Sequence, residues 1–184
     1  MVEINAMRFA AFLDRDGTII ETRVVNGVPI AETVCSEIRV LPKVKEALEI
    51  LRSLGYEIIV VTNQPDVSRG KTNISSIDQI HRYIQEELGI DRFYVCYHDD
   101  SDECNCRKPK TELIFAAARE LSINVAKSVV IGDRWRDVEL GQRVGCRTFY
   151  IDMNYAEKRP IHPYERVISL HDAALKLRAE ANGE

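Results

Sequence analysis

The chain has 184 residues, of which 45% are hydrophobic, and this is enough apolar material for one domain with a sizeable core. This composition excludes a disordered tail and a disulfide-stapled miniprotein. The 25 Lys and Arg residues are outnumbered by 29 Asp and Glu residues, so the net charge of −4 gives no general attraction to nucleic acid or to an anionic membrane. An anionic ligand must therefore be held by local positive charge.

The sequence also bears on the compartment and on the partners of the protein. No apolar run approaches the roughly 20 residues that a membrane span needs, and residues 1–9 lack the layout of a secretion signal. Three of the five cysteines fall within eleven positions, which in a reducing compartment indicates a metal site rather than disulfides. We therefore expect a cytoplasmic monomer with no nucleic-acid or membrane partner.

Predicted strands and helices alternate along the chain. Short apolar runs that end in polar residues are typical of strands buried on both faces of a sheet, and they cover residues 9–13, 58–61, 93–95, 129–131 and 148–151. Helical patterns cover residues 42–54, 76–88, 111–121, 136–144 and 172–181. The alternation predicts a single α/β domain over residues 1–184, with a Rossmann-like, doubly wound parallel sheet and helices on both faces.

One segment interrupts this alternation. Within residues 19–30, the pair Asn26-Gly27 lies between two short stretches rich in valine and isoleucine, which is the signal of a tight β-hairpin. We expect a small flap there rather than a second domain. Residues 154–163, which contain two prolines, are predicted to form an irregular crossing segment.

Polar residues follow the predicted strands at the edge where open parallel sheets bind their ligands. These residues are Asp14, Asp16, Gly17, Thr18, Thr62, Asn63, Gln64, Arg107, Lys108, Gly132, Asp133, Arg134 and Asp137. The Asp, Thr and Gly residues among them are each common in turns and caps, but together the residues suit a phosphate group and a divalent cation. Asp14 and Asp133 offer hard oxygen ligands to Mg²⁺, which takes one or two protein carboxylates together with phosphate oxygens.

These residues form four ordered motifs: Asp14-x-Asp16-Gly17-Thr18, Thr62, Lys108-Pro109 and Gly132-Asp133-x-x-x-Asp137. The motifs resemble those of haloacid dehalogenase-type phosphatases over residues 9–151. Residues 13–20, 62–64 and 106–110 are similar to the histidinol-phosphate and heptose-bisphosphate phosphatase subgroup. The resemblance implies a HAD-like fold, and the short intervals between motifs leave no room for a separate cap domain over the site.

The resemblance implies a role for each catalytic residue. Asp14 would attack phosphorus and form an aspartyl phosphate, which divides one difficult hydrolysis into two easier steps. Asp16 would protonate the leaving group and then activate water. Thr62 and Lys108 would bind the phosphoryl oxygens, where charge accumulates during transfer.

The resemblance also implies a ligand set for Mg²⁺ and a group of substrate-binding residues. Mg²⁺ would be held by the carboxylate of Asp14, the backbone carbonyl of Asp16 and the carboxylate of Asp133. Asp137 would orient these ligands without contacting the ion itself. The residues expected to face the substrate are Asn63, Gln64, Arg107 and Arg134, and Arg69 could reach a second phosphate.

A second metal site is expected in the loop over residues 96–106. Three thiols and one imidazole, from Cys96, His98, Cys104 and Cys106, make a complete tetrahedral set for structural Zn²⁺. The set resembles the zinc loop of the same phosphatase subgroup, and the gap of five residues after His98 is closer to the histidinol-phosphate member. Because Cys106 directly precedes Arg107 and Lys108, bound zinc would fix the backbone that carries both cations. The acidic residues inside the loop, Asp99, Asp100, Asp102 and Glu103, are expected to form a solvated tip.

We predict a Mg²⁺-dependent phosphatase for a small phosphorylated metabolite, and we favour a heptose phosphate or bisphosphate, with histidinol phosphate as the alternative. Specificity would come from the flap, residues 64–71 and the zinc loop. Two other classes stay open. A phospho-receiver module would not need Asp16 as an acid, and a zinc-knuckle nucleic-acid binder would have only Tyr97 in the loop for base stacking.

Overall fold

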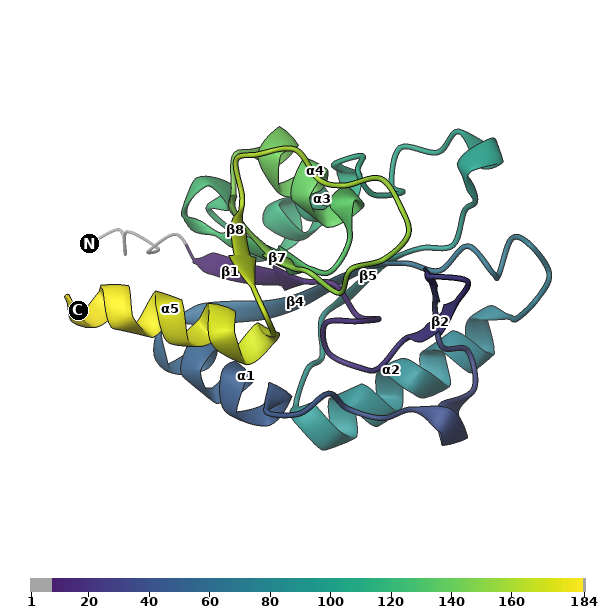
Figure 1. Cartoon of the computed structure of the whole chain (residues 1–184), viewed down its shortest axis with the longest axis horizontal. Coiled ribbons are helices and arrows are strands. Elements are labelled where there is room, and N and C mark those ends of the chain that lie inside the picture. The colour runs from purple at the N-terminus through teal and green to yellow at the C-terminus, as the bar shows by residue number, and fades with distance from the viewer. Residues whose placement is uncertain (1–7, 184) are drawn as a thin grey trace.

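The computed structural model describes residues 8–183, so most of the segment in which a secretion signal was sought lies outside the described residues. Its centre is a sheet of six parallel strands in the order β5-β4-β1-β6-β7-β8 (Figure 1). The strands are β1 (Phe9–Leu13), β4 (Tyr56–Asn63), β5 (Phe93–Cys96), β6 (Val129–Gly132), β7 (Arg147–Ile151) and β8 (Glu165–Val167). The predicted parallel α/β architecture is confirmed.

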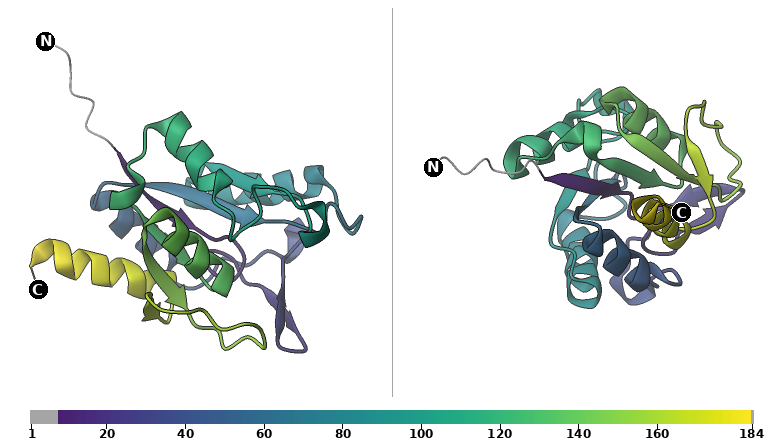
Figure 2. Two further views of the ribbon diagram at one scale, coloured as in Figure 1. Left: turned by 90° about the horizontal axis from the view of Figure 1, so that it is seen from above. Right: turned by 90° about the vertical axis from the view of Figure 1, so that its left-hand side faces the viewer.

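The helices of residues 8–183 cover the two faces of this sheet (Figure 1). They are α1 (Val44–Ser53), α2 (Ile74–Leu88), α3 (Glu112–Leu121), α4 (Trp135–Val144) and α5 (Leu170–Asn182). Helices α1, α2 and α5 lie on one face, with α1 and α5 in contact side by side, and α3 and α4 lie on the other (Figures 1 and 2). Short 3₁₀ turns occur at η1 (Cys35–Glu37), η2 (Asp100–Asp102) and η3 (Val125–Lys127). Within residues 8–183, every helix is too short or too polar to span a bilayer.

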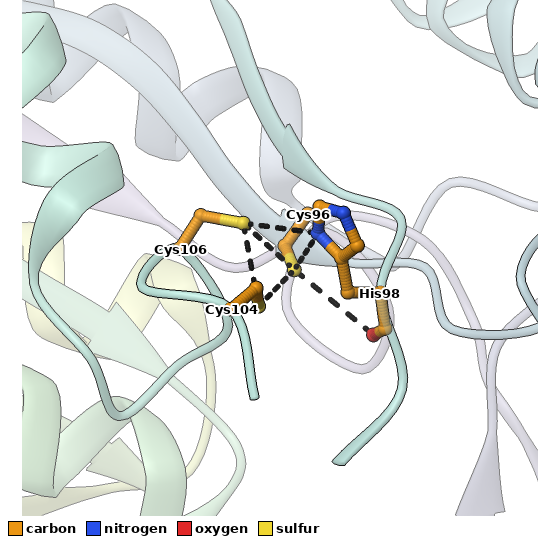
Figure 3. A group of neighbouring side chains, drawn as sticks. All are labelled: Cys96, His98, Cys104 and Cys106. Atoms are coloured by element: carbon orange, nitrogen blue, oxygen red, sulfur yellow. Dashed lines mark hydrogen bonds between the residues drawn. The ribbon is translucent and has the colours of Figure 1, made fainter. Parts of the chain in front are cut away.

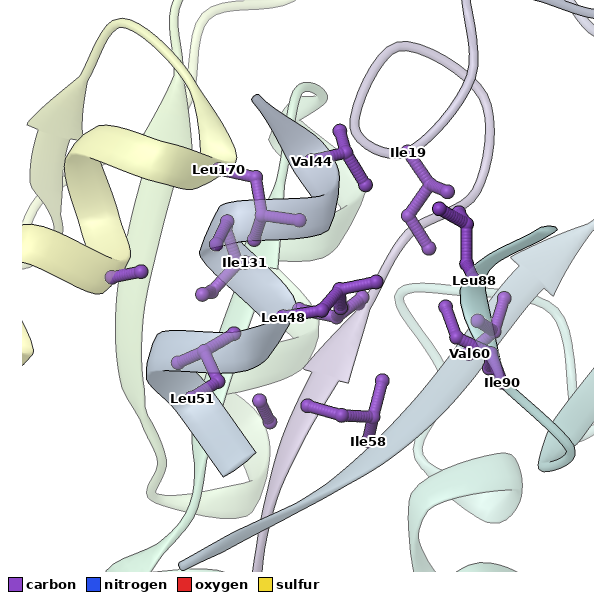
Figure 4. Close-up of a cluster of buried hydrophobic side chains, with 14 of the residues drawn as sticks. Ile19, Val44, Leu48, Leu51, Ile58, Val60, Leu88, Ile90, Ile131 and Leu170 are labelled. Atoms are coloured by element: carbon purple, nitrogen blue, oxygen red, sulfur yellow. The ribbon is translucent and has the colours of Figure 1, made fainter. Parts of the chain in front are cut away.

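The hydrophobic core has two parts because the central strand is buried on both faces. Ala11 and Leu13 of β1 pack toward α1, α2 and α5, whereas Ala10 and Phe12 pack toward α3 and α4. Leu48 of α1 lies fully buried in the first part (Figure 4). This two-sided burial holds β1 rigid, and β1 ends directly before the motif that begins at Asp14.

The predicted flap is a two-stranded hairpin, formed by β2 (Arg23–Val25) and β3 (Val28–Ile30). Asn26 and Gly27 both have positive φ values, 51° and 77°, as the tight turn of a hairpin requires. The hairpin projects from the body of the protein (Figure 2), and the backbone N–H of Ala156 donates to the carbonyl of Gly27 at 2.7 Å. The flap tip therefore rests on the crossing segment that follows β7.

Several boundaries differ from the sequence-based prediction, and one strand was not predicted. Helix α1 begins at Val44 rather than at residue 42, because Lys43 adopts a left-handed conformation with φ of 60°. Helix α2 begins at Ile74, two residues early, because the side chain of Asn73 accepts from the N–H of Ser76 and caps the helix. Strand β8 was not predicted, since its three residues contain no apolar run.

Candidate active site

Asp14, Lys108 and Asp137 form the centre of the site. Asp14 follows β1, and its backbone N–H donates to the carbonyl of Ile131 on the neighbouring strand at 3.0 Å. The ammonium group of Lys108 donates to Asp14 Oδ1 and to Asp137 Oδ1, both at 2.6 Å, and to the carbonyl of Val61 at 2.8 Å. Burial alone would lower the pKa of Lys108, but Asp137 and Asp14 raise it above its ordinary value. Lys108 is therefore a buried cation with all three protons donated.

Asp133 follows β6 and is fully buried. The hydroxyl of Tyr155 donates to Asp133 Oδ2 at 2.7 Å, whereas Oδ1 has no hydrogen-bond partner among residues 8–183. Gly17 lies against this carboxylate, and a Cβ atom at position 17 would be 1.9 Å from Oδ2. The motif requires glycine here for two reasons, because the backbone of Gly17 also has a φ of +82°.

Three carboxylates in this centre could hold a cation. One oxygen from each of Asp14, Asp133 and Asp137 lies within 4.8 Å of the other two. Burial raises the pKa of Asp14 to about 6, with Lys108 acting against this rise and Asp137 adding to it. Burial also raises the pKa of Asp133 well above its ordinary value. A divalent cation would relieve this accumulation of buried negative charge and would give Oδ1 of Asp133 a partner, so these residues fit Mg²⁺.

Asp16 lies beside this centre, and four N–H donors contact its carboxylate. Arg15, which is completely buried, donates from Nε to Oδ2 at 3.0 Å and from Nη2 to Oδ1 at 3.1 Å. The N–H of Glu32 donates to Oδ1 at 3.0 Å, and the amide of Gln64 donates to Oδ2 at 2.8 Å. Nη1 of Arg15 lies 3.4 Å from Nε2 of His81, so the guanidinium is itself anchored on α2. Asp16 is thus held in one orientation by its surroundings.

Three polar residues at the end of β4, Thr62, Asn63 and Gln64, differ in burial and in contacts. Asn63 lines the pocket over Asp14, and it joins the two loops because Nδ2 donates to the carbonyl of Lys108 at 3.2 Å and Oδ1 accepts from its N–H at 3.0 Å. Gln64, which was expected to face the substrate, is instead buried and donates to Asp16 and to the hydroxyl of Thr62. Thr62 is also buried, beneath Gln64. Gln64 is therefore placed to orient these two side chains rather than to meet a ligand.

The pocket continues outward from Asp14 to the surface. Thr22, Pro29 and Ala31 of the flap segment line its inner part, opposite Arg134 and Arg136. The outer part is lined by the flap, by the segment after β4 and by the loop after β5, as expected from the sequence, and its cationic residues are Arg69, Lys71, Arg107, Arg134 and Arg136. Of the predicted substrate-binding arginines, Arg134 lines both parts, whereas Arg69 and Arg107 line only the outer part.

The cluster of thiols and imidazole in the loop after β5 is brought together as predicted (Figure 3). The sulfur of Cys106 lies 3.2 Å from that of Cys96 and 3.6 Å from that of Cys104, and the latter two are 3.7 Å apart. Nδ1 of His98 is 3.3 Å from the sulfur of Cys106. Tetrahedral ligands about 2.3 Å from a zinc ion would be separated by roughly 3.8 Å, so this donor set fits structural Zn²⁺.

The acidic residues of this loop were expected to form a solvated tip, and two of them also form ion pairs with arginines that the sequence did not indicate. Asp99 accepts two hydrogen bonds from Arg69, at 2.6 and 2.8 Å, and Asp100 accepts from Arg107 at 2.8 Å. Asp100 also lies 3.3 Å from Arg136. The loop folds back over the outer pocket, where these carboxylates pair with arginines, although the side chain of Asp100 stays 58% exposed.

Several residues of the site were missed in the sequence. Arg15, Arg136 and Tyr155 contact the predicted residues directly, and Trp135 packs under Arg136, with 4.6 Å between the guanidinium carbon and the ring centroid. Arg15 and Arg136 lie inside the motifs, at positions where the motif pattern leaves the residue open. Tyr155 lies in the irregular segment, where the sequence carries no signal.

Comparison with known proteins shows to which family the chain belongs. Residues 29–145 match the haloacid dehalogenase-like hydrolases. A D-glycero-beta-D-manno-heptose-1,7-bisphosphate 7-phosphatase of Helicobacter pylori is 36% identical over 138 residues, which are 72% of this chain and 76% of that protein. The histidine biosynthesis bifunctional protein HisB of Blochmanniella floridana is 31% identical over 83% of this chain and 43% of that protein.

A crystal structure of the D,D-heptose 1,7-bisphosphate phosphatase from B. bronchiseptica, complexed with magnesium and phosphate, shares the fold. It matches with a TM-score of 0.80 over 94% of this chain and 99% of that chain, at 22% identity. The chain therefore belongs to the haloacid dehalogenase-like hydrolases, within them to the family of the heptose-1,7-bisphosphate 7-phosphatases, and it is a phosphatase.

Proposed function

We propose that this phosphatase hydrolyses the phosphomonoester of a small phosphorylated sugar through an aspartyl phosphate on Asp14. The observation that carries the proposal is the placement of Asp14 at the floor of an open pocket, with Lys108 at 2.6 Å and Asp133 and Asp137 close behind. A carboxylate next to a buried ammonium group suits attack on phosphorus, because the positive charge of Lys108 offsets the negative charge that spreads over the phosphoryl oxygens.

Asp16 is our candidate for the acid and base of the reaction. It lines the same pocket as Asp14 and lies two residues further along the chain. In the first step it would give a proton to the oxygen of the leaving sugar, and in the second it would take a proton from the attacking water. Arg15 and Gln64, which contact its two oxygens, would set the direction from which Asp16 reaches the substrate.

We assign the two metal sites by the fit of their donors. Asp14, Asp133 and the backbone carbonyl of Asp16 would hold Mg²⁺, with Asp137 bound to Lys108 behind them. When bound, this ion supplies positive charge to the phosphoryl oxygens. The related B. bronchiseptica phosphatase was crystallised with magnesium and phosphate, which supports the assignment. Zn²⁺ would be held in the loop after β5 by its three cysteines and His98.

A heptose phosphate is the substrate that we favour, because several of the related proteins are heptose-1,7-bisphosphate 7-phosphatases. Histidinol phosphate is the second candidate. It is favoured by the short gap of five residues in the zinc loop and by the similarity to the histidine biosynthesis protein HisB.

The test is a comparison of kcat/KM over heptose phosphates, histidinol phosphate and nucleotides with Mg²⁺ present, because discrimination between substrates is expressed in that ratio. We expect Asp14→Asn to abolish turnover and Asp91→Asn, at an exposed position after α2, to leave it intact. A fluoride mimic of the phosphoryl group should be found on Asp14. Retained turnover in Asp14→Asn, or the mimic bound to another residue, would overturn the proposal.

Asp16→Asn separates a hydrolase from a phospho-receiver. The asparagine cannot exchange a proton, so a hydrolase should lose multiple turnover, whereas a receiver would still accept one phosphoryl group. The assignment of the chain to a family of hydrolases argues against the receiver class and against the nucleic-acid-binding class.

A further inference from the structure

A buried histidine on α2 lies behind the candidate acid and base, and the proposed reaction gives it no role. His81 is 8% exposed, and its ring stacks on that of Phe93 with 4.4 Å between the centroids. Burial lowers the pKa of His81 from 6.5 to about 4, so the imidazole is neutral at physiological pH. A neutral imidazole has one ring nitrogen that donates a hydrogen bond and one that accepts.

The accepting nitrogen of His81 is identified by its neighbour, Arg15. Nη1 of Arg15 lies 3.4 Å from Nε2 of His81, and a guanidinium group can only donate, so Nε2 is the acceptor. Within residues 8–183, Nη1 makes no other hydrogen bond. Arg15 is completely buried, so water cannot take the place of the imidazole. Loss of Nε2 would therefore leave a buried N–H group unpaired, which is costly.

The other donors of Arg15 reach the segment that contains Asp16. Nε and Nη2 donate to the two carboxylate oxygens of Asp16 at 3.0 and 3.1 Å, and Nη2 also donates to the carbonyl of Glu32 at 3.0 Å. Asp16 and Glu32 lie on either side of the flap. His81 is instead held by α2, whose neighbouring residues Ile77, Ile80 and Ile84 are completely buried in the core. The contact with His81 thus ties the guanidinium group to a rigid part of the protein.

We infer that His81 is a positioning residue, which keeps the guanidinium group of Arg15 in place while Asp16 turns toward the oxygen of the leaving group. This inference rests on the proposed function, in which Asp16 is the acid. The carboxyl group can separate from Arg15 only if the guanidinium group does not follow it, and the contact with Nε2 of His81 opposes that movement. His81 should therefore affect proton transfer to the leaving group rather than the attack by Asp14.

The importance of this proton depends on the leaving group. The alkoxide of a sugar is a strong base and has to be protonated as its bond to phosphorus breaks, whereas p-nitrophenolate is a weak base that can leave without a proton. Misplacement of Asp16 should therefore slow the hydrolysis of an alkyl phosphate and spare that of p-nitrophenyl phosphate. A general loss of folding or of metal binding would slow the hydrolysis of both.

The test measures kcat and KM of His81→Phe with p-nitrophenyl phosphate and with an alkyl phosphate, heptose 1,7-bisphosphate or histidinol phosphate, at saturating Mg²⁺. Phenylalanine keeps a ring against Phe93 but offers Arg15 no acceptor. General acid–base catalysis contributes about 10²–10⁴-fold, so we expect kcat for the alkyl phosphate to fall by about tenfold or more. For p-nitrophenyl phosphate, kcat should change by less than about threefold.

Two further variants serve as controls. His81→Gln places an amide oxygen close to the position of Nε2, so it should keep kcat for the alkyl phosphate within about threefold of the wild-type value. His171→Phe makes the same aromatic replacement at a half-buried histidine of α5 that lines neither part of the pocket, and it should leave both kcat values unchanged. If His81→Phe does not fold, His81→Asn replaces it with the same expectations, because its shorter amide does not reach Nη1.

The outcomes separate this inference from the proposed function. Equal losses for the two substrates in His81→Phe, no loss for either, or a His81→Gln variant as slow as His81→Phe would overturn the role of His81. Each of these results would leave the phosphatase proposal standing, because the wild-type enzyme would still hydrolyse its substrates. Absence of hydrolysis of every phosphate ester by the wild-type enzyme with Mg²⁺ present would overturn the proposed function itself.

Discussion

Replacement of Lys108 by methionine tests the electrostatics of the catalytic centre. Methionine keeps the aliphatic stem but removes the ammonium group, which donates to Asp14 and Asp137 at 2.6 Å and to the carbonyl of Val61 at 2.8 Å. The two carboxylates are 8% and 2% exposed, so water cannot replace the lost donor. Removing one partner of a buried ion pair destabilises a protein by about 3–5 kcal/mol. We expect a loss in that range at neutral pH.

The measurement is urea-induced unfolding in buffer free of Mg²⁺, with the slope of the transition compared between variants. Lys110→Met is the matched control, because Lys110 lies two residues away and is exposed, and within the described part of the chain its side chain donates only to the carbonyl of Cys104. We expect it to change stability by less than about 0.5 kcal/mol. A loss below about 1 kcal/mol for Lys108→Met, or equal losses for the two variants, would refute the view that Lys108 neutralises the centre. With Mg²⁺ present, kcat should fall by about a hundredfold or more, as when one donor to a developing oxyanion is removed.

Three further changes probe other parts of the molecule. Burial, and to a lesser degree the nearby Arg15, lowers the pKa of His81 from 6.5 to about 4. Between these pH values the imidazole is protonated in the unfolded chain but neutral in the folded protein, so the stability of the protein falls as the pH drops from 6.5 to 4. Urea titrations should show that His81→Gln removes up to about 3 kcal/mol of this pH dependence. Gly17→Ala should nearly abolish turnover, because the new Cβ atom would overlap Asp133. Gly145 also has a positive φ, but a Cβ atom there would meet nothing within 4 Å, so Gly145→Ala should affect only stability, by about 1 kcal/mol. Chelation of zinc should lower turnover before circular dichroism detects unfolding, and unchanged turnover in zinc-free protein would contradict the coupling of the loop to Lys108.

The fold was predictable where its signals are local and repeated. The run at residues 9–13 coincides with β1, because a strand buried on both faces must be apolar throughout. Strand β8 escaped prediction, since of its three residues only Val167 is buried and its pairing with β7 is the reason that it is a strand. The start of α1 depended on the left-handed backbone of Lys43, which no residue pattern signals at a lysine.

The site was predictable where backbone topology decides the position of a side chain. Asp14 and Asp133 directly follow the adjacent strands β1 and β6, so they must lie close together whatever their side chains contact. The partners of Asp99, Asp100 and Arg136 depend instead on where a long loop crosses the pocket, and sequence spacing carries no such information. Loop residues that look like a solvated charged tip can therefore be the counterions of a binding pocket.

The contacts of Asp16 limit how this enzyme can complete its site. A carboxyl group that protonates a leaving group must turn at least one oxygen toward the substrate, yet both oxygens of Asp16 accept from Arg15, and each also accepts from Glu32 or Gln64. Asp14 cannot move toward the substrate instead of Asp16, because the backbone of Asp14 is hydrogen-bonded to β6. Among the described residues, neither interval between the catalytic motifs contains a cap domain whose closure could rearrange Asp16. If Asp16 is the acid, the substrate itself must therefore draw its side chain away from Arg15, which makes the Arg15 contact a barrier that only a well-fitting leaving group overcomes.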